Sequence, residues 1–391
     1  AGNGDHQGFG RVGGDGVMKK LLPEVCTIQY GFPFDSAKFS DSNGMPLIRI
    51  RDVVRGYSET YTTEEYKSEY IVHENDLLIG MDGEFNIAKW GKTPALLNQR
   101  VCRLAPNDSI DKDYLFYFMP IALKRIEEKT PFVTVKHLSA KELNKIEIPI
   151  LPLEEQRKIA ETLSKVDELI AFRDRQLAKL DELVKARFVE MFGNPIENTM
   201  NWPKKLLRDI TTKIGSGATP KGGRESYPNA GVSLIRSMNV YDGQFLYKDL
   251  AHLTDEQATQ LNGVTVEAED VLVNITGASV ARSCVVPKDV LPARVNQHVA
   301  IVRCNRELLN PIFTNKMFIN NEFKKALLSI GESGGATRQA ITKKQLEELS
   351  VVVPPLSIQN EFFTFSECVD QQKQTVQQSL EKLELMKKAL M

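Results

Sequence analysis

The chain has 391 residues, of which 42% are hydrophobic and 26% charged, so it can bury its own cores in two or three domains. Its net charge of −1 gives the chain as a whole no signature of a nucleic-acid binder, and only local charge could do so. No apolar run approaches the roughly 20 residues of a membrane span, and no secretory signal opens the chain, which predicts a cytoplasmic protein with no membrane contact.

The first 17 residues are glycine-rich and aperiodic, and we expect residues 1–17 to be a tag or a disordered leader. The five cysteines are scattered and never form a CxxC pair, which argues against a disulfide framework and a zinc site. We therefore predict core thiols.

Residues 18–151 are predicted to form a compact α+β domain. Short apolar runs such as "PLIRIRDV", "NDLLIGMDG" and "QRVCRLAP" are separated by Gly, Pro, Asn and Asp, as in strands joined by turns. The segment 114–129 has helical spacing.

Residues 152–193 are predicted to form one long helix. Pro152 suits its first position, acidic residues follow in the first turn, and Gly193 supplies the stop. At about 1.5 Å per residue the helix would be roughly 60 Å long. Apolar residues at alternating spacings of four and three predict a coiled-coil seam, made of Ile159, Leu163, Val166, Ile170, Leu177, Leu180 and Val184.

Residues 194–355 repeat the pattern of the first domain with "VSLIRSMNV", "EDVLVNITG" and "NQHVAIVRC". A second long helix is predicted over 356–391, with its seam at Phe362, Val369, Val376, Leu380 and Leu383. This seam is poorer than the first, because Ser366, Lys373 and Lys387 replace apolar residues. That departure predicts either weaker helix pairing or contact with a partner.

Several short motifs recur in the same order, which indicates an internal duplication. "IQYG" at Ile28 answers "IGSG" at Ile214, "DLLI" at Asp76 answers "DVLV" at Asp270, and "NQRV" answers "NQHV". We predict two tandem α+β domains related by a pseudo-two-fold duplication and separated by two long antiparallel coiled-coil helices. The alternative is a pair of unrelated helices, each docked on its own domain.

Catalytic signatures are scarce. The glycine-rich "GSGATPKGG" from Gly215 resembles a phosphate loop but fits neither GxxxxGK[ST] nor GxGxxG. The histidines show no metal-ligand spacing, so we predict no catalytic residue and no metal.

Local charge is more informative. Between Asn201 and Val240 there are seven basic and two acidic residues, interleaved with Gly, Ser and Thr, which suits a phosphate-contacting surface. Loops at matched positions near His137 and Arg338 offer further donors, and a solvated basic face remains an alternative. The predicted DNA-binding residues are Arg49, Arg51, Lys136, His137, Lys213, Thr219, Lys221, Arg224, Arg236, Thr337, Arg338 and Gln339.

The junction "IPILPLEEQRKIAETLSKVDELI", the helix exit "FVEMFGNPIENTMNWPKKLLRDI" and the segment "KIGSGATP" resemble those of the specificity (S) subunit of type I restriction-modification enzymes. The resemblance covers nearly everything after Met18. It implies a non-catalytic chain whose domains each read one half of a bipartite double-stranded DNA target. The paired helices would act as a spacer that docks two modification subunits.

The resemblance places the cofactors on other chains. The modification subunits would bind S-adenosylmethionine and methylate adenine, and restriction subunits, when present, would hydrolyse ATP. Two other functions stay open: a coiled-coil scaffold that binds only protein, and an enzyme that binds a nucleotide at the Gly215 loop.

Overall fold

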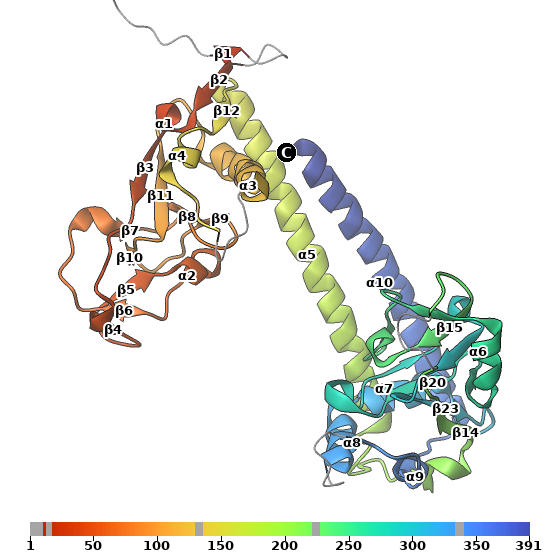
Figure 1. The fold of residues 1–391 in the computed structure, drawn as a ribbon. Coiled ribbons are helices and arrows are strands. Elements are labelled where there is room, and N and C mark those ends of the chain that lie inside the picture. The colour runs from red at the N-terminus through yellow and green to blue at the C-terminus, as the bar shows by residue number, and fades with distance from the viewer. Residues whose placement is uncertain (1–10, 13–17, 130–135, 221–226, 333–339) are drawn as a thin grey trace, which may run out of the picture. The chain divides into compact units, whose positions relative to one another are not determined.

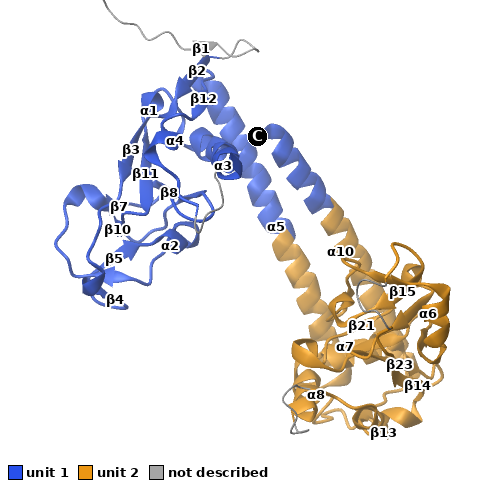
Figure 2. Ribbon diagram, in the orientation of Figure 1, with its two compact units in different colours: residues 1–173, 379–391 blue, residues 174–378 orange. Residues whose placement is uncertain are grey.

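The computed structural model describes residues 11–12, 18–129, 136–220, 227–332 and 340–391 (Figure 1). The chain divides into two compact units, with residues 1–173 and 379–391 in unit 1 and residues 174–378 in unit 2 (Figure 2). Two long helices, α5 (Leu153–Phe192) and α10 (Leu356–Leu390), each contribute to both units. Each unit therefore combines one globular domain with a part of both long helices.

Unit 1 contains a four-stranded antiparallel sheet and a five-stranded mixed sheet. The four-stranded sheet has the order β3 (Cys26–Tyr30), β11 (Val101–Pro106), β8 (Leu77–Gly80), β9 (Asn86–Lys89). The five-stranded sheet has the order β4 (Phe39–Ser40), β6 (Tyr61–Thr62), β5 (Met45–Ile48), β10 (Ala95–Leu97), β7 (Ile71–Val72).

A third, small sheet of unit 1 pairs β1 (Arg11–Val12), β2 (Met18–Leu21) and β12 (Glu147–Pro149) in that order. Two residues of the expected leader thus form a strand, because β2 offers them a free edge. The helices of the globular part are α1 (Leu22–Val25), α2 (Ile50–Arg55), α3 (Lys112–Lys129) and α4 (Ala140–Leu143).

Unit 2 repeats this plan. Its antiparallel sheet has the order β14 (Thr211–Ser216), β23 (Val299–Cys304), β20 (Val271–Asn274), β21 (Ser283–Val285). Its mixed sheet has the order β18 (Ala251–Leu253), β15 (Val232–Ile235), β22 (Ala293–Val295), β19 (Thr265–Val266). The parallel pair β15 and β22 corresponds to β5 and β10 of unit 1.

The described part of unit 2 also contains two short strand pairs and several α-helices. β13 (Lys204–Leu206) pairs with β24 (Ser350–Val352), and β16 (Val240–Tyr241) pairs with β17 (Gln244–Phe245). The helices are α6 (Asp255–Gln260), α7 (Pro311–Ile319), α8 (Asn321–Glu332) and α9 (Lys343–Glu347). The shared strand order confirms the predicted α+β duplication.

The repeated motifs occupy equivalent places because each meets a specific structural demand. A Cβ atom added to Gly31 would lie 2.0 Å from the carbonyl oxygen of Asn98, and one added to Gly217 would lie 1.7 Å from that of Val295. Each glycine therefore lets the end of β3 or β14 pass against another backbone segment.

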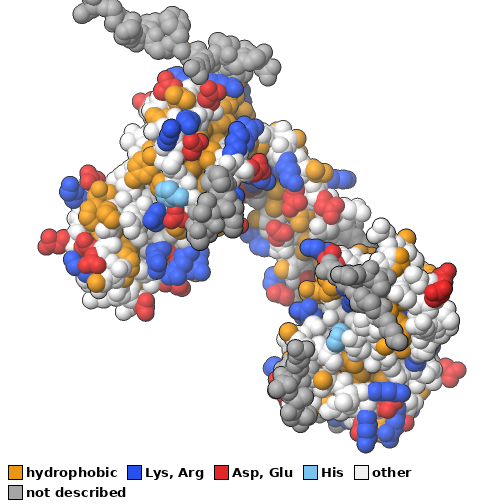
Figure 3. Space-filling view, viewed as in Figure 1, with side chains coloured by type: hydrophobic (Ala, Val, Ile, Leu, Met, Phe, Trp, Pro, Cys, Tyr) orange, Lys and Arg blue, Asp and Glu red, His pale blue; other side chains and the backbone are white. Residues whose placement is uncertain are grey.

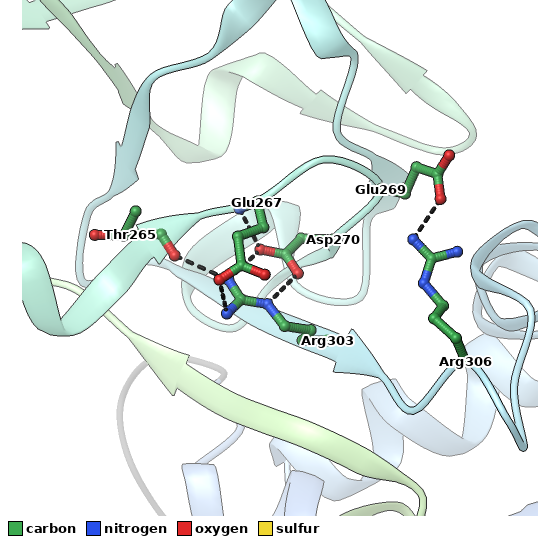
Figure 4. Close-up of polar contacts among 6 residues, drawn as sticks. All are labelled: Thr265, Glu267, Glu269, Asp270, Arg303 and Arg306. Atoms are coloured by element: carbon green, nitrogen blue, oxygen red, sulfur yellow. Dashed lines mark hydrogen bonds and ion pairs between the residues drawn. The ribbon is translucent and has the colours of Figure 1, made fainter.

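The acidic residue of "DVLV" organises a buried ion pair (Figure 4). Asp270 is 1% exposed, and its two carboxylate oxygens each lie 2.8 Å from a nitrogen of Arg303, a bidentate arrangement. Arg303 also donates to the carbonyl of Thr265 at 3.0 Å and contacts Glu267. In unit 1, Asp76 and Arg103 form the equivalent pair at 3.0 Å.

The ends of the long helices pack on the globular cores of their own units. In unit 1, Leu163 is part of the core and Ile159 packs against it. In unit 2, Val184, Phe362 and Val369 belong to the core. Of the other predicted seam residues, Val166, Val376 and Leu380 are buried, and Ile170, Leu177, Leu180 and Leu383 are half-buried.

Within unit 2 the two helices run antiparallel, since Asp181 pairs with Lys373 at 2.6 Å while the later residue Arg187 pairs with the earlier residue Glu361 at 3.1 Å. The seam lysines thus have partners on α5, and in unit 1 Lys387 pairs with Asp167 at 2.6 Å. The long aliphatic stems of the lysines cover apolar surface while their ammonium groups reach an aspartate.

Four of the five cysteines are buried, as predicted for core thiols, and Cys368 is exposed. Burial raises the pKa of Cys26, Cys102 and Cys284 to about 12 and that of Cys304 to about 11. No helix in the described parts of the chain is long and apolar enough to cross a bilayer.

Candidate nucleic-acid interface

The same three segments meet in each unit and gather polar side chains there. The first is the turn after β8 or β20, the second joins the mixed sheet to β11 or β23, and the third precedes α4 or α9. The turn contains Gly83 in unit 1 and Gly277 in unit 2, with φ of 76° and 75°. The left-handed backbone at both positions favours glycine and fixes the direction of the preceding side chain.

In unit 1 these segments form a cluster of Asp82, Arg100 and His137. Asp82 Oδ1 lies 2.5 Å from His137 Nδ1, and Asp82 Oδ2 lies 3.5 Å from Arg100 Nε. Asp82 and His137 also share a backbone bridge, which Gly83 N–H extends by donating to the Lys136 carbonyl at 2.9 Å. The side chains of Arg100 and His137 are about half exposed, at 53% and 49%.

In unit 2 the equivalent place holds a different set of side chains. Thr276 Oγ1 lies 2.5 Å from His298 Nδ1, and His298 Nε2 lies 3.0 Å from Gln297 Nε2. Gln297 in turn contacts the hydroxyl of Thr219. A backbone bridge between Thr276 and Ala340 replaces the bridge of unit 1. The two units therefore share a scaffold but differ in charge at this position.

A pocket of about 620 Å³ adjoins the cluster of unit 2 and is lined by Thr276, His298, Tyr241 and Arg282, among others. The Arg282 guanidinium carbon lies 4.3 Å from the centroid of the Tyr241 ring. An arginine stacked on an aromatic ring at the surface is a common arrangement where bases or phosphates bind.

In unit 1 an open groove of about 750 Å³ lies beside His137. Its basic lining residues include Arg125 and Lys129 of α3, Lys19 and Lys145. Lys145 is paired with Glu142 at 2.9 Å. The groove has the character of a surface that could follow a phosphate backbone.

Two of the predicted DNA-binding residues lie in these clusters, namely His137 and Thr219. Lys136 does not, because its ammonium group turns to the carbonyl of Glu127 at 2.9 Å and is 21% exposed. Arg49 and Arg51 lie at the start of α2, where the Arg49 N–H donates to Asp52 Oδ2 at 2.9 Å. Both arginine side chains are exposed.

Lys213 and Arg236 lie in separate depressions of unit 2. Lys213 lines an open groove together with Arg208 and Lys343. Arg236 contacts the carbonyl of Asp249, and its guanidinium carbon lies 6.0 Å from the centroid of the Tyr227 ring. Five predicted residues lie outside the described residues, namely Lys221, Arg224, Thr337, Arg338 and Gln339.

Each unit has a group of basic side chains on the face in view. Lys and Arg side chains cluster over α2 in unit 1 and near β13 in unit 2 (Figure 3). Acidic side chains lie beside the basic group of each unit. This distribution agrees with a net charge near zero for the whole chain.

Sequence reasoning missed Asp82, Arg100, Gln297 and His298 as site residues. The signal was present, since Arg100 and His298 are the differing third residues of "NQRV" and "NQHV". Asp82 and Thr276 likewise differ within the matched "MDG" and "ITG" turns. A position that varies inside an otherwise repeated motif keeps its place in the fold but changes its chemistry.

Gly215 and Ser216 belong to strand β14, where Gly215 pairs with Ile301. Gly215 therefore pairs in a ladder rather than opening a phosphate-cradling loop, and residues 221–223 of the glycine-rich segment lie outside the described residues. Within the described ranges, no group of three His, Cys, Asp or Glu side chains could hold a metal ion.

Residues 14–182 and 200–385 match the family model of the type I restriction modification DNA specificity domain. The type I restriction enzyme EcoBI specificity subunit of Escherichia coli is 29% identical over 92% of this chain and 81% of its own length. The putative type I restriction enzyme MjaX specificity subunit of Methanocaldococcus jannaschii is 24% identical over 98% of this chain and 93% of its own length.

Solved structures share the fold. The S subunit of a type I restriction-modification system from M. genitalium aligns with a TM-score of 0.58 at 15% identity, over 95% of this chain and 94% of that one. A chain from a study of complex assembly and conformational transition of the type I R-M system aligns with a TM-score of 0.58 at 16% identity, over 95% of both chains.

Proposed function

Since the chain belongs to the type I restriction-modification DNA specificity family, we propose that it selects a bipartite, asymmetric DNA sequence for modification. Specificity subunits are not themselves catalytic, so the chain acts as the reader of a larger complex. Each unit reads one half of the target through the side chains at its matched cluster.

One observation carries this proposal: two units of the same topology hold different side chains at the same place. At equivalent positions unit 1 holds Asp82, Arg100 and His137, whereas unit 2 holds Thr276, His298 and Ala340. A shared scaffold with changed polar groups suits two readers of different base sequences. Identical readers would select a palindrome, and these two would select an asymmetric target.

The long helices are proposed as both spacer and docking platform. Large apolar side chains on α5 remain exposed, with Leu169 and Phe172 in unit 1 and Leu183 and Val189 in unit 2. Exposed apolar residues on a helix are a typical contact surface for another protein. We assign this surface to two modification subunits, with restriction subunits joining when present.

S-adenosylmethionine and ATP belong, in this proposal, to the partner subunits. The cytoplasm remains the predicted compartment. A spacer role also predicts that lengthening both long helices together changes the number of base pairs tolerated between the half-sites.

The decisive measurement is the pattern of methylated adenines in the genomic DNA of the host. We expect a split, asymmetric motif that disappears when the gene for this chain is deleted and returns on complementation. A continuous palindromic motif, or an unchanged pattern after deletion, would refute the proposal.

The scaffold alternative makes a different prediction. A chain that binds only protein would assemble with its partners but confer no sequence preference on DNA binding. Competition between duplexes of scrambled and matched sequence, with the assembled complex at a fixed salt concentration, separates these possibilities.

A further inference from the structure

We propose that Arg100 reads a guanine in the half-site contacted by unit 1, and that Asp82 is the residue that positions it. The inference deepens the proposed function and rests on it. It assigns a base to one named side chain, whereas the proposed function requires only that each unit contributes some reader.

The geometry leaves the correct atoms of Arg100 available. Its Nε lies 3.5 Å from Asp82 Oδ2, so this ion pair draws the inner edge of the guanidinium group toward the carboxylate. Among the described residues, no hydrogen bond engages the two terminal nitrogens, and the side chain is 53% exposed. Two parallel N–H donors match O6 and N7 of guanine in the major groove.

Asp82 is itself held firmly, which makes it suitable as a support. His137 Nδ1 contacts its second oxygen at 2.5 Å, and the backbone bridge to His137 fixes the segment that carries it. The side chain is only 21% exposed. Because both carboxylate oxygens already face basic groups, Asp82 orients Arg100 rather than accepting a hydrogen bond from a base.

Pre-orientation matters because a free arginine side chain loses rotamer freedom when it binds a base. An arginine that is already ion-paired with a carboxylate has lost part of that freedom in the unbound protein. A lysine at the same position would keep the charge but would lack the planar pair of donors.

Unit 2 has no arginine–aspartate pair at the equivalent place. His298 replaces Arg100 and Thr276 replaces Asp82, and both ring nitrogens of His298 already have neighbours in Thr276 and Gln297. Arg282 reaches the nearby pocket from the turn before β21 and is stacked on Tyr241 instead of being paired with a carboxylate. The effect of changing Arg100 is therefore confined to one half-site.

The test uses the full chain assembled with its modification subunits. Three variants are compared with the wild type: Arg100→Lys, Arg100→Ala and Asp82→Asn. Host-genome methylation gives the motif of each variant, and competition binding gives its preference for guanine at each position of the half-site. Purification of the intact complex shows that a variant has folded.

We expect Arg100→Ala to lose the preference for one guanine, a discrimination of between about 5-fold and about 150-fold. Arg100→Lys, which keeps a donor for O6 and N7 without the planar pair, and Asp82→Asn should each weaken the same preference by a smaller factor. Replacing that guanine by 7-deazaguanine, which lacks the N7 acceptor, should weaken binding of the wild type but not of Arg100→Ala.

Two control variants show what is expected of a phosphate contact and of a change in the other unit. Arg125→Ala, in the basic groove of unit 1, should weaken binding to all sequences equally, as expected of a phosphate contact. His298→Ala should leave the guanine preference of the unit 1 half-site unchanged.

The inference is overturned if Arg100→Ala keeps the wild-type motif, if Arg100→Ala weakens all sequences equally, or if the altered position is not a guanine. In each of these cases a bipartite wild-type motif would leave the proposed function intact. Failure of the proposed function is separate, because the wild type itself would then show no split motif.

Discussion

Gln156 and Gln359 are both completely buried, and each forms the same pattern of hydrogen bonds within its own unit. The amide oxygen of each accepts a backbone N–H, from Asp111 at 2.8 Å in unit 1 and from Asn310 at 2.9 Å in unit 2. These two acceptor contacts connect the first turns of α5 and α10 to the segments that open α3 and α7.

The amide nitrogens complete the pattern by donating to backbone carbonyls. Gln156 donates to Leu151 at 2.8 Å and to Ser109 at 3.4 Å. Gln359 donates to Pro354 at 2.7 Å and to Leu308 at 3.0 Å. A buried amide that satisfies three backbone groups fixes the direction in which a long helix leaves its domain.

We expect Gln156→Ala to lower the free energy of unfolding by about 1–3 kcal/mol, because it removes the partner of the part-buried Asp111 N–H and of the Leu151 and Ser109 carbonyls. Urea unfolding measures the change. Arg157→Ala, an exposed change one residue along α5, is the control and should have an effect below about 0.5 kcal/mol. Equal effects of the two variants would contradict the role assigned to Gln156.

Asp270→Asn should destabilise the protein by about 3 kcal/mol. The substitution removes a buried charge that holds Arg303 through two hydrogen bonds and leaves the arginine with the exposed carboxylate of Glu267 alone among the described residues. The exposed pair of Lys325 and Glu322 supplies the comparison, since Glu322→Gln should cost less than about 1 kcal/mol. Thermal unfolding of both variants under one buffer tests the difference.

Ser366→Ala should stabilise the protein. The Ser366 hydroxyl is buried on the seam of α10 and has no hydrogen-bond partner among the described residues, so its removal relieves a desolvation cost of about 1 kcal/mol. Ser329→Ala in α8 is exposed and measures the gain from helix propensity alone. If the two variants raise the unfolding midpoint equally, the buried hydroxyl carries no cost.

Thiol labelling should distinguish one cysteine from the other four. The pKa of Cys102 and Cys284 is raised to about 12 by burial, so their thiolates are scarce in the native state at pH 8. Cys368 is exposed. We expect one thiol to react in the native chain, five after unfolding, and none in native Cys368→Ser. Rapid labelling of a second native thiol would contradict the buried assignment.

The same thiols predict how stability depends on pH. Because the native pKa lies above the unfolded value of 9.0, the native state binds more protons in the range from about pH 9 to 12. The contribution of these groups to stability is therefore complete below pH 9 and declines as pH rises through that range. Unfolding titrations at pH 8 and pH 10 of the wild type and of Cys284→Ala measure this contribution.

Sequence alone was sufficient for the duplication and for the α+β class with two long helices. Those features depend on local requirements that recur in order along the chain. Gly31 and Gly217 are needed wherever a backbone passes too close for a Cβ atom, and a seam of alternating spacing needs no knowledge of distant residues. Each requirement can therefore be recognised from a short stretch of sequence.

Only the tertiary structure decided which polar side chains meet. Asp82 and His137 lie 55 residues apart in the chain, and their contact depends on a backbone bridge that no local pattern encodes. Likewise, the sequence shows Lys373 only as a charged residue on an apolar seam, whereas in the structure its ammonium group pairs with Asp181 on the other helix at 2.6 Å. A charged side chain pairs with whichever opposite charge the fold brings within a few ångströms. Its partner therefore depends on distance in space and, unlike a hydrophobic repeat, cannot be read from spacing along the sequence.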